Sequence, residues 1–508
     1  MSTVFGLFLL SVLSGLLSLD NLQIGQFMIS RPFFAGTVMG ILSGCPAEGA
    51  TIGLFFEIIF SSEMPLGGSI PYNGLAGTSA AIAAIRAGSF LPELAFFYGL
   101  VFAWIYTKAD IKMREMRSAW NIRASENISY GLDYPGSWLM RSFAAEFFAM
   151  FLCIFSAGFL SFLISLTQVP AFILNGARFS YSLVPVLGIG ILYFHFRSHF
   201  RNMSLSGNEN GDSEKAKDSK TAVFNDPEHK KTRKQCFFRL FFIQSGWNFS
   251  HFQNFGFLYA IKPFLEKIYG KGTSAFDKAM LRNFEKVNTN PVMSSLLVGA
   301  VIILEKSFSE GKIKEERLRQ VKQSVASAAA SAGDSVFWAR VKPVSLQLGI
   351  FIWLLAGVNS WLFGFHSEAA ERISLFALSS GPLFSVIAYS FFAVYMRKKG
   401  FEAGLSGNEL NLYGLADFPF PRIIRRLSIA GFVFSSALMI EMFLFFFIKA
   451  RDERMGEQQI VLRILLVLAM LLICRMAAVK KLYMPHILWS LFFAAVILSA
   501  LKIPVVLF

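Results

Sequence analysis

Long apolar stretches bounded by charged or turn-forming residues recur along the chain, and they limit its fold more than any other feature. They cover 3–19, 76–87, 92–107, 139–166 and 181–196, and later 345–364, 376–396, 428–449, 460–474 and 485–501. A helix needs about 20 apolar residues to cross a bilayer, where only helices and closed barrels satisfy their backbone hydrogen bonds. Charged residues make up 16% of the chain, against about 25% in soluble domains. The sequence therefore predicts an all-α polytopic membrane protein.

The apolar stretches fall into two blocks that a polar segment separates. Residues 201–234 contain few aromatic residues and carry charges of both signs, a composition typical of a flexible linker. We therefore expect one helical membrane domain over 1–200 and a second over 235–508. Within the second, 235–344 carries scattered polar and basic residues and is expected to form amphipathic helices in or on the membrane.

Two apolar stretches are too short to cross the membrane alone. Residues 76–87 and 92–107 would have to tilt, pair as re-entrant elements, or continue through weakly polar neighbours. Residues 36–75 are rich in Gly, Pro and Ser yet still apolar, and irregular backbone survives at membrane depth only inside protein or along a cavity. We therefore expect broken or re-entrant helices here, and a substrate site among them.

The net charge of +15 is explained by membrane orientation. Basic residues cluster in the segments 108–123, 230–234, 397–426 and 475–481, and the spans between them place these segments on one side. That side is predicted to be cytoplasmic, where basic residues also meet anionic membrane lipid. The chain has no basic, aromatic-interleaved soluble domain, so nucleic acid is not an expected partner.

Two acidic residues are candidates for a polar site. Glu57 lies inside the apolar run GATIGLFFEIIF, and a carboxylate at membrane depth costs about 2.5–3.5 kcal/mol unless it meets a polar cavity or a partner. The alternative is a structural role, in which Glu57 lies at a helix end or has its hydrogen bonds satisfied within the protein. Asp334 follows a run of small residues at 327–333, and it is suited both to capping the next helix and to binding a ligand hydroxyl. For Glu63, beside turn residues, a structural role is favoured.

Amides beside aromatic rings supply a further candidate. The segment 244–257 contains Gln244, Trp247 and Asn248; rings stack on the faces of sugars while amides bind hydroxyls. An aromatic belt at the membrane interface is the alternative. His195 and His199 have a spacing that suits a metal, but a third ligand is missing, and two side chains extending to the membrane surface are favoured. The sequence contains no nucleotide-binding or nucleophile motif, so no cofactor, metal or catalytic residue is expected.

Several motifs, in order, resemble a known family. The first block resembles the IIC permease component of mannose-family sugar phosphotransferase systems through 18–44 and 50–83. These segments contain a Gln-x-x-x-Ser-Arg-Pro-like stretch from Gln26 to Pro32 and an apolar-Glu-apolar helix around Glu57. The second block is similar to the IID component through 239–270, 284–292, 332–343 and 396–405. Two components that are normally separate chains thus look fused through 201–234.

The resemblance implies a function and its partners. In such systems IIC and IID form the translocation complex, generally a trimer, in the bacterial cytoplasmic membrane. A soluble IIB protein, phosphorylated by IIA, transfers phosphate to the incoming hexose or amino sugar. No residue of this chain is expected to carry phosphate. The resemblance implies these sugar-hydroxyl ligands: Glu57, Asn73, Gln26, Asn248, Asn290 and Asp334.

The chain departs from the family pattern at several places, including the run before Gly333, which is rich in Ala and Ser where the family has Gly and Pro. The usual Gly-Asp is Gly44-Cys45, the usual Pro-Pro-Asp ends in Asn73, and the usual Asn-Thr-His-Pro contains Asn290 instead of His. Two functions therefore stay open at this point: a fused IIC–IID permease, and a degenerate, non-transporting relative that acts as a membrane sensor or docking scaffold.

Overall fold

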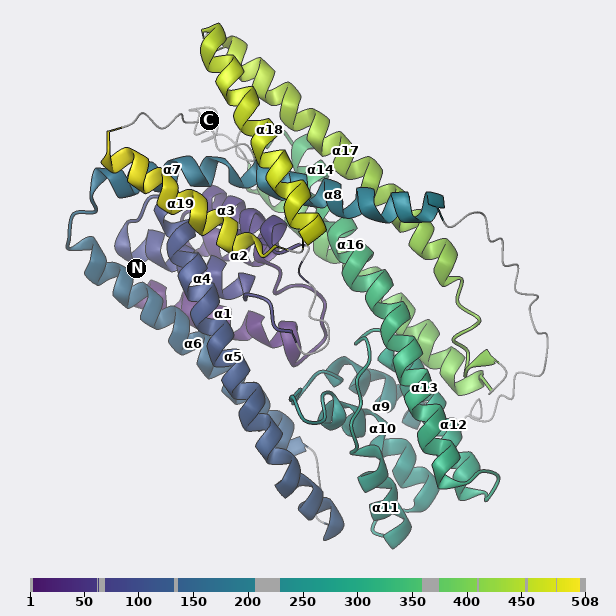
Figure 1. Ribbon diagram of the computed structural model, residues 1–508. Helices are drawn as coiled ribbons and strands as arrows, with labels where there is room; N and C mark the ends of the chain where they lie inside the picture. The colour runs from purple at the N-terminus through teal and green to yellow at the C-terminus, as the bar shows by residue number, and fades with distance from the viewer. Residues whose placement is uncertain are drawn as a thin grey trace.

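The computed structural model is built from helices, as the sequence predicts. It describes residues 3–502 except 62, 64–68, 132–135, 206–228, 359–373, 409–410, 453–455 and 481. The first half contains α1 (Thr3–Leu22), α2 (Pro32–Ser43), α3 (Pro46–Ile59), α4 (Gly74–Gly88), α5 (Pro92–Ser129), α6 (Gly136–Ser165), α7 (Ala171–Ser182) and α8 (Val184–Leu205). The second half contains α9 (Lys230–Arg239), η2 (Leu240–Phe242), α10 (Asn254–Tyr269), α11 (Ser274–Asn283), α12 (Ser294–Ser309), α13 (Glu315–Gly333), η3 (Asp334–Val341), α14 (Lys342–Leu355), α16 (Leu375–Ser406), α17 (Phe420–Asp452), α18 (Glu457–Lys480) and α19 (Met484–Ala500). Figure 1 shows their arrangement.

The segment expected to be irregular, 36–75, is largely a helical hairpin. Helices α2 and α3 have only 12 and 14 residues and pack against each other. Each begins with a proline, Pro32 or Pro46, at the position where a helix tolerates its missing N–H. The chain reverses at Gly44, whose φ of 77° suits glycine. A Cβ at Gly53 would collide with the carbonyl oxygen of Pro32, so only glycine lets the two backbones approach this closely.

The stretch 92–107 forms the start of a much longer helix. Helix α5 continues through the basic segment to Ser129 and has 38 residues. Its polar end extends away from the apolar helices and contacts α11 of the second half, as Figure 1 shows at the bottom of the molecule. Helix α4, by contrast, stays short, with 15 residues.

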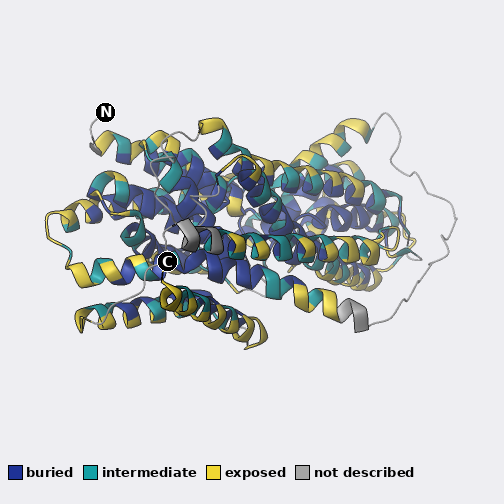
Figure 2. Cartoon of the chain, turned by 90° about the horizontal axis from the view of Figure 1, so that it is seen from above, coloured by how far each residue is buried: buried dark blue, intermediate teal, exposed yellow. Residues whose placement is uncertain are grey.

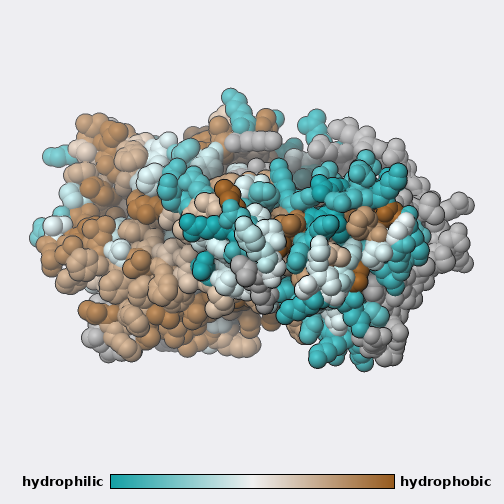
Figure 3. Space-filling view, turned by 90° about the horizontal axis from the view of Figure 1, so that it is seen from below, coloured by the Kyte–Doolittle hydropathy of each residue, from teal (hydrophilic) through white to brown (hydrophobic). Residues whose placement is uncertain are grey.

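Among the described residues, seven helical segments are long and apolar enough to cross a membrane. They are Val4–Leu22, Pro92–Ser129, Gly136–Ser165, Ala171–Arg201, Leu375–Ser406, Phe420–Phe446 and Glu457–Lys480. The chain is therefore a multi-pass membrane protein. The expected spans 345–364 and 485–501 correspond to the shorter helices α14 and α19, and 359–364 lies outside the described residues. In the view from below, hydrophilic side chains gather toward α12 and α13 and apolar ones toward the opposite side (Figure 3).

The two halves share an apolar core cluster. Helix α8 packs against α17 and α18, α19 packs against α7, and α16 packs against α2. The ring of Phe33 meets the ring of Trp353 edge to face, with the ring centres 4.8 Å apart. Buried residues gather in the interior of the molecule (Figure 2). Most of the expected linker 201–234 lies outside the described residues; its two ends belong to α8 and α9.

Candidate functional site

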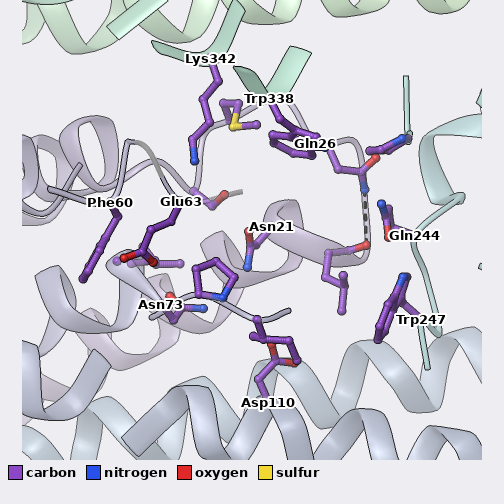
Figure 4. Close-up of a pocket in the computed structure, with 18 of the residues that line it drawn as sticks. Asn21, Gln26, Phe60, Glu63, Asn73, Asp110, Gln244, Trp247, Trp338 and Lys342 are labelled. Atoms are coloured by element: carbon purple, nitrogen blue, oxygen red, sulfur yellow. Dashed lines mark hydrogen bonds between the residues drawn. The ribbon is translucent and has the colours of Figure 1, made fainter. Parts of the chain in front are cut away.

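A cavity of about 240 Å³ lies between the two halves. The first half contributes the α1–α2 connection, the end of α3, the segment 69–75 and the middle of α5. The second half contributes the segments around Gln244, Gln253 and Thr289, and the helical stretch from Ala330 to Lys342. Figure 4 shows these side chains converging from both halves. The candidate site therefore depends on elements that are far apart in the sequence.

Glu57 lines this cavity and is also paired. The Arg31 Nε atom donates a hydrogen bond to Glu57 Oε1, and the backbone N–H of Phe33 donates to Glu57 Oε2 over 3.1 Å. The side chains of Arg31 and Glu57 are 2% and 3% exposed. Arg31 also donates to the Ser345 hydroxyl (2.7 Å) and to the Lys342 carbonyl oxygen (2.9 Å). The structural role and the cavity role expected for Glu57 are thus compatible, because the carboxylate is paired with Arg31 and also borders the cavity.

Asp334 lines the cavity from the second half. Its Oδ1 atom accepts a hydrogen bond from Asn290 Nδ2 over 2.9 Å. Among the residues that the structure describes, Thr289 and Pro291 line the cavity, but Asn290 between them does not. Burial raises the pKa of Asp334, and the hydrogen bond from Asn290 partly offsets that rise. A Cβ at Gly333 would meet the Asn290 side chain, so the glycine lets this pair form.

The capping role considered for Asp334 is wrong. The residue has helical angles (φ −64°, ψ −40°), and α13 continues through it into a π-helical segment, η3. An N-cap residue would instead have non-helical angles. Single π-helical turns are rare and often occur at functional sites, and this one presents both Asp334 and Trp338 to the cavity.

Asn73 and Gln26 also line the cavity, each with its amide oxygen already engaged. Asn73 is the N-cap of α4, and its Oδ1 atom accepts from the backbone N–H of Ala76 over 2.9 Å. Gln26 Oε1 accepts from Arg397 over 2.8 Å. Both amides therefore offer their NH₂ groups to a ligand.

Asn248, by contrast, lies outside the described lining of the cavity. Its Oδ1 atom accepts from Asn121 Nδ2 (2.9 Å) and from the Ser250 hydroxyl (2.9 Å). Its Nδ2 atom donates to Asn254 Oδ1 (3.0 Å) and to the Gly246 carbonyl oxygen (3.1 Å). The side chain is fully buried and joins the loop after η2 to α5 of the first half. Its hydrogen bonds thus support the architecture around the cavity.

Trp247, next to Asn248, does line the cavity. The guanidinium of Arg114 lies over its ring, 4.6 Å from the ring centre, and is within the favourable range for a cation–π contact. Arg114 also forms two hydrogen bonds to the Asp110 carboxylate, at 3.0 and 2.8 Å. Asp110 and Arg114 line the cavity, although from the sequence we expected them only to belong to the basic segment 108–123. Their i,i+4 spacing on one helix was the available signal.

Glu63 and Lys342 face the same part of the cavity (Figure 4). The Tyr483 hydroxyl is the hydrogen-bonding group near the Glu63 carboxylate. Burial raises the pKa of Glu63 to about 8, although the nearby Lys342 opposes the rise. Burial likewise lowers the pKa of Lys342. From the sequence we expected a structural role for Glu63, because the turn residues beside it do not reveal the cavity.

The two histidines contact the π-helical segment η3. His195 Nε2 lies 2.9 Å from the carbonyl oxygen of Ala339, and His199 Nδ1 lies 3.3 Å from Arg340 Nη2. In the part of the chain that the structure describes, no group of three His, Cys, Asp or Glu residues is placed to hold a metal.

Comparisons with known proteins match each half separately. Residues 4–197 match the model of the sorbose-specific IIC component of the phosphotransferase systems. Residues 229–362 match the model of the IID component of the mannose/fructose/sorbose family. Together the two matches span more than half of the chain.

Two individual relatives are IID components. The mannose-specific EIID component of Escherichia coli K12 is 30% identical over 114 residues, which cover 22% of this chain and 40% of that protein. The fructose permease IID component of Bacillus subtilis 168 is 28% identical over 151 residues, 29% of this chain and 54% of that protein. The chain thus spans less than two thirds of the length of either relative.

A solved structure aligns over a longer stretch. The cryo-EM structure of the mannose transporter ManYZ in complex with microcin E492 is 21% identical and covers 53% of this chain and 96% of that one, with a TM-score of 0.29. At this score the likeness supports no argument about the site.

Proposed function

The chain belongs to the mannose family of sugar phosphotransferase permeases, with a IIC and a IID component in one polypeptide, and we propose that it carries a monosaccharide across the membrane. The sugar, a hexose or an amino sugar, is phosphorylated by a separate IIB protein that receives phosphate from IIA. The chain itself carries no phosphate. Membership of the family rests on the two matched halves.

The observation that carries this proposal is the cavity between the IIC-like and IID-like halves. It is lined by carboxylates and amides from both: Glu57, Asn73 and Gln26 from the first half, and Asp334 from the second. Carboxylate oxygens accept hydrogen bonds from sugar hydroxyls, and amide NH₂ groups donate to them. Trp247 and Trp338 add aromatic surface to the same cavity, which suits the apolar faces of a sugar ring.

The location of the cavity also fits transport. Permeases hold their substrates where short or broken helices meet within the membrane. Here the short helices α2 and α3 and the π-helical segment η3 contribute lining residues. In this proposal Glu57 and Asp334 contact the sugar directly, while Asn248 and Asn290 support the residues that do.

We extend the proposal to the organisation of the protein. Residues 1–200 form the IIC-like domain and 235–508 the IID-like domain, joined through 201–234. The protein acts in the bacterial cytoplasmic membrane, with its basic segments and the IIB docking side in the cytoplasm, and it assembles as a trimer of identical chains. No observation favours the alternative of a non-transporting sensor or scaffold.

The test is sugar uptake with defined partners. Membrane vesicles containing the full chain are supplied with the cognate IIA and IIB proteins and a phosphate donor, and uptake of labelled monosaccharides is measured. Accumulation of a phosphorylated sugar that requires IIB is expected. In parallel, purified protein is screened for thermal stabilisation by a panel of monosaccharides, because a ligand that binds the folded state raises its stability. Absence of both stabilisation and uptake would contradict the proposal.

A further inference from the structure

The connection between α1 and α2 has an unusual backbone. Gln26 and Met28 have positive φ angles of 52° and 64°, which are uncommon for residues other than glycine. From the first half, the Asp20 carboxylate accepts hydrogen bonds from the backbone N–H groups of Phe27 (2.7 Å) and Ser30 (3.2 Å). From the second half, the Ser390 hydroxyl of α16 donates to the Phe27 carbonyl oxygen over 2.5 Å. This strained loop is therefore held from both sides.

Arg397, about two helical turns after Ser390 on α16, reaches this loop with a charged group. Its Nη1 atom donates to the Gly25 carbonyl oxygen (2.5 Å) and its Nη2 atom to Gln26 Oε1 (2.8 Å). Its guanidinium also lies 4.9 Å from the ring centre of Phe241. The side chain is fully buried, and among the described residues no carboxylate lies within salt-bridge distance of it. The Asp20 carboxylate acts on this cation through its charge, but the two hydrogen bonds of the guanidinium to the loop go to neutral oxygens.

The contact with Arg397 fixes the orientation of the Gln26 amide. A guanidinium has only donors, whereas a glutamine amide has one acceptor oxygen and an NH₂ group with two donors. Turning the amide over would set N–H groups of both residues against each other. The Gln26 oxygen therefore stays on Arg397, and the Nε2 atom makes one long contact of 3.4 Å to the Leu22 carbonyl oxygen. Because Gln26 lines the cavity, an N–H group remains for a ligand.

We propose that Arg397 is a positioning residue for substrate selection: it makes Gln26 a donor toward the sugar and prevents it from accepting. The selected group on the sugar is then an acceptor, such as a hydroxyl or carbonyl oxygen. This inference rests on the proposed function, because it concerns the sugar bound in the same cavity. In this inference Arg397, from the IID-like half, orients Gln26, a sugar-binding side chain of the IIC-like half.

The experiment uses the full-length purified chain and the monosaccharide that stabilises the wild type best. Affinities are measured for that sugar and, at each ring position, for its deoxy and deoxyfluoro analogues. A fluorine accepts a hydrogen bond weakly but cannot donate one, whereas the deoxy analogue does neither. At the ring position that faces Gln26, the wild type should bind the deoxy analogue about tenfold more weakly than the parent sugar. The fluoro analogue should lose clearly less affinity.

Two variants separate positioning from general support of the fold. In Arg397→Met the Gln26 amide is free to turn, so the preference for the fluoro over the deoxy analogue should disappear. Gln26→Glu gives Arg397 a counter-ion but removes the donor, so it should raise the unfolding temperature while weakening sugar binding about tenfold. Arg397→Lys, which keeps a donor, should restore part of the preference. Ser390→Ala, which removes the other contact from α16, should retain the wild-type ratio between the two analogues.

The outcomes distinguish the two proposals. If the wild type binds a sugar but Arg397→Met keeps the wild-type analogue preference, the positioning role is overturned while the proposed function stands. If Arg397→Met does not fold, Gln26→Glu decides, and wild-type affinity in that variant overturns the role. If the wild type binds no monosaccharide and transports none, the proposed function fails, and the positioning role fails with it.

Discussion

The guanidinium of Arg31 and the carboxylate of Glu57 form an ion pair that is almost completely buried at the boundary between the two halves of the chain. The pair does more than neutralise two charges, because Arg31 also donates hydrogen bonds to Ser345 and to the Lys342 carbonyl oxygen of the second half. A residue expected to bind substrate is thus linked to the packing of both halves.

Replacing Glu57 should therefore affect both stability and transport. Glu57→Ala leaves Arg31 as an unpaired buried cation, which should lower the free energy of unfolding by about 3–5 kcal/mol and abolish sugar uptake. Glu57→Gln keeps a hydrogen-bond acceptor and should destabilise less while still reducing uptake strongly. Thermal unfolding and vesicle uptake with IIB measure the two effects. Wild-type uptake in either variant would remove Glu57 from the site.

Asn248 should behave differently from Asn73, although both were expected to bind the sugar. Asn248→Ala removes a fully buried amide from a hydrogen-bonded cluster, so it should lower stability by about 1–3 kcal/mol. The affinity of the remaining folded protein for sugar should change little. Asn73→Ala should weaken binding directly, because its amide lines the cavity. Calorimetric titration and thermal unfolding of both variants give the comparison, and a large loss of affinity in folded Asn248→Ala would contradict it.

Glu63 should make stability depend on pH. Its pKa is about 8 in the folded protein, against an ordinary value of 4.5, so between these values the folded state binds more protons than the unfolded state. By linkage, the contribution of Glu63 to stability falls as the pH rises from about 5 to 8. Glu63→Gln should therefore unfold at a higher temperature than the wild type at pH 8, and the gap should narrow at pH 5.

The matched control for this measurement is Glu310→Gln. Glu310 is exposed beside Lys312, and this interaction lowers its pKa. The control should not reproduce the gain in stability at pH 8. If the unfolding temperature of Glu63→Gln depended on pH as that of the wild type does, the Glu63 carboxyl would have an ordinary pKa.

Cutting the chain between the halves should leave them associated. A protease site placed within 206–228 separates the chain into two fragments, but the shared core, which includes the contact between Phe33 and Trp353, should hold them together. Both fragments are expected to co-purify and to bind sugar as the intact chain does. Separation of the fragments in mild detergent would show that the covalent connection is required.

The sequence alone determined the class of fold and the family. Apolar stretches such as 139–166 predict membrane helices because a bilayer leaves the backbone few alternatives, and that constraint acts on each segment locally. Motifs around Glu57 and Asp334 are likewise local, so the pattern of residues was enough to identify two side chains that line the cavity.

Tertiary structure decided which polar side chains reach the cavity and which serve the fold. Asn248 and Asn73 are chemically alike in the sequence, but one is surrounded by Asn121, Ser250 and Asn254 and the other lies at the start of α4 beside the cavity. The partner of Glu57 lies 26 positions earlier in the chain, and the partner of Gln26 lies 371 positions later. Hydrogen bonds act over about 3 Å, so their effect on charge and orientation depends on which distant segments fold together, and a one-dimensional pattern does not contain that information.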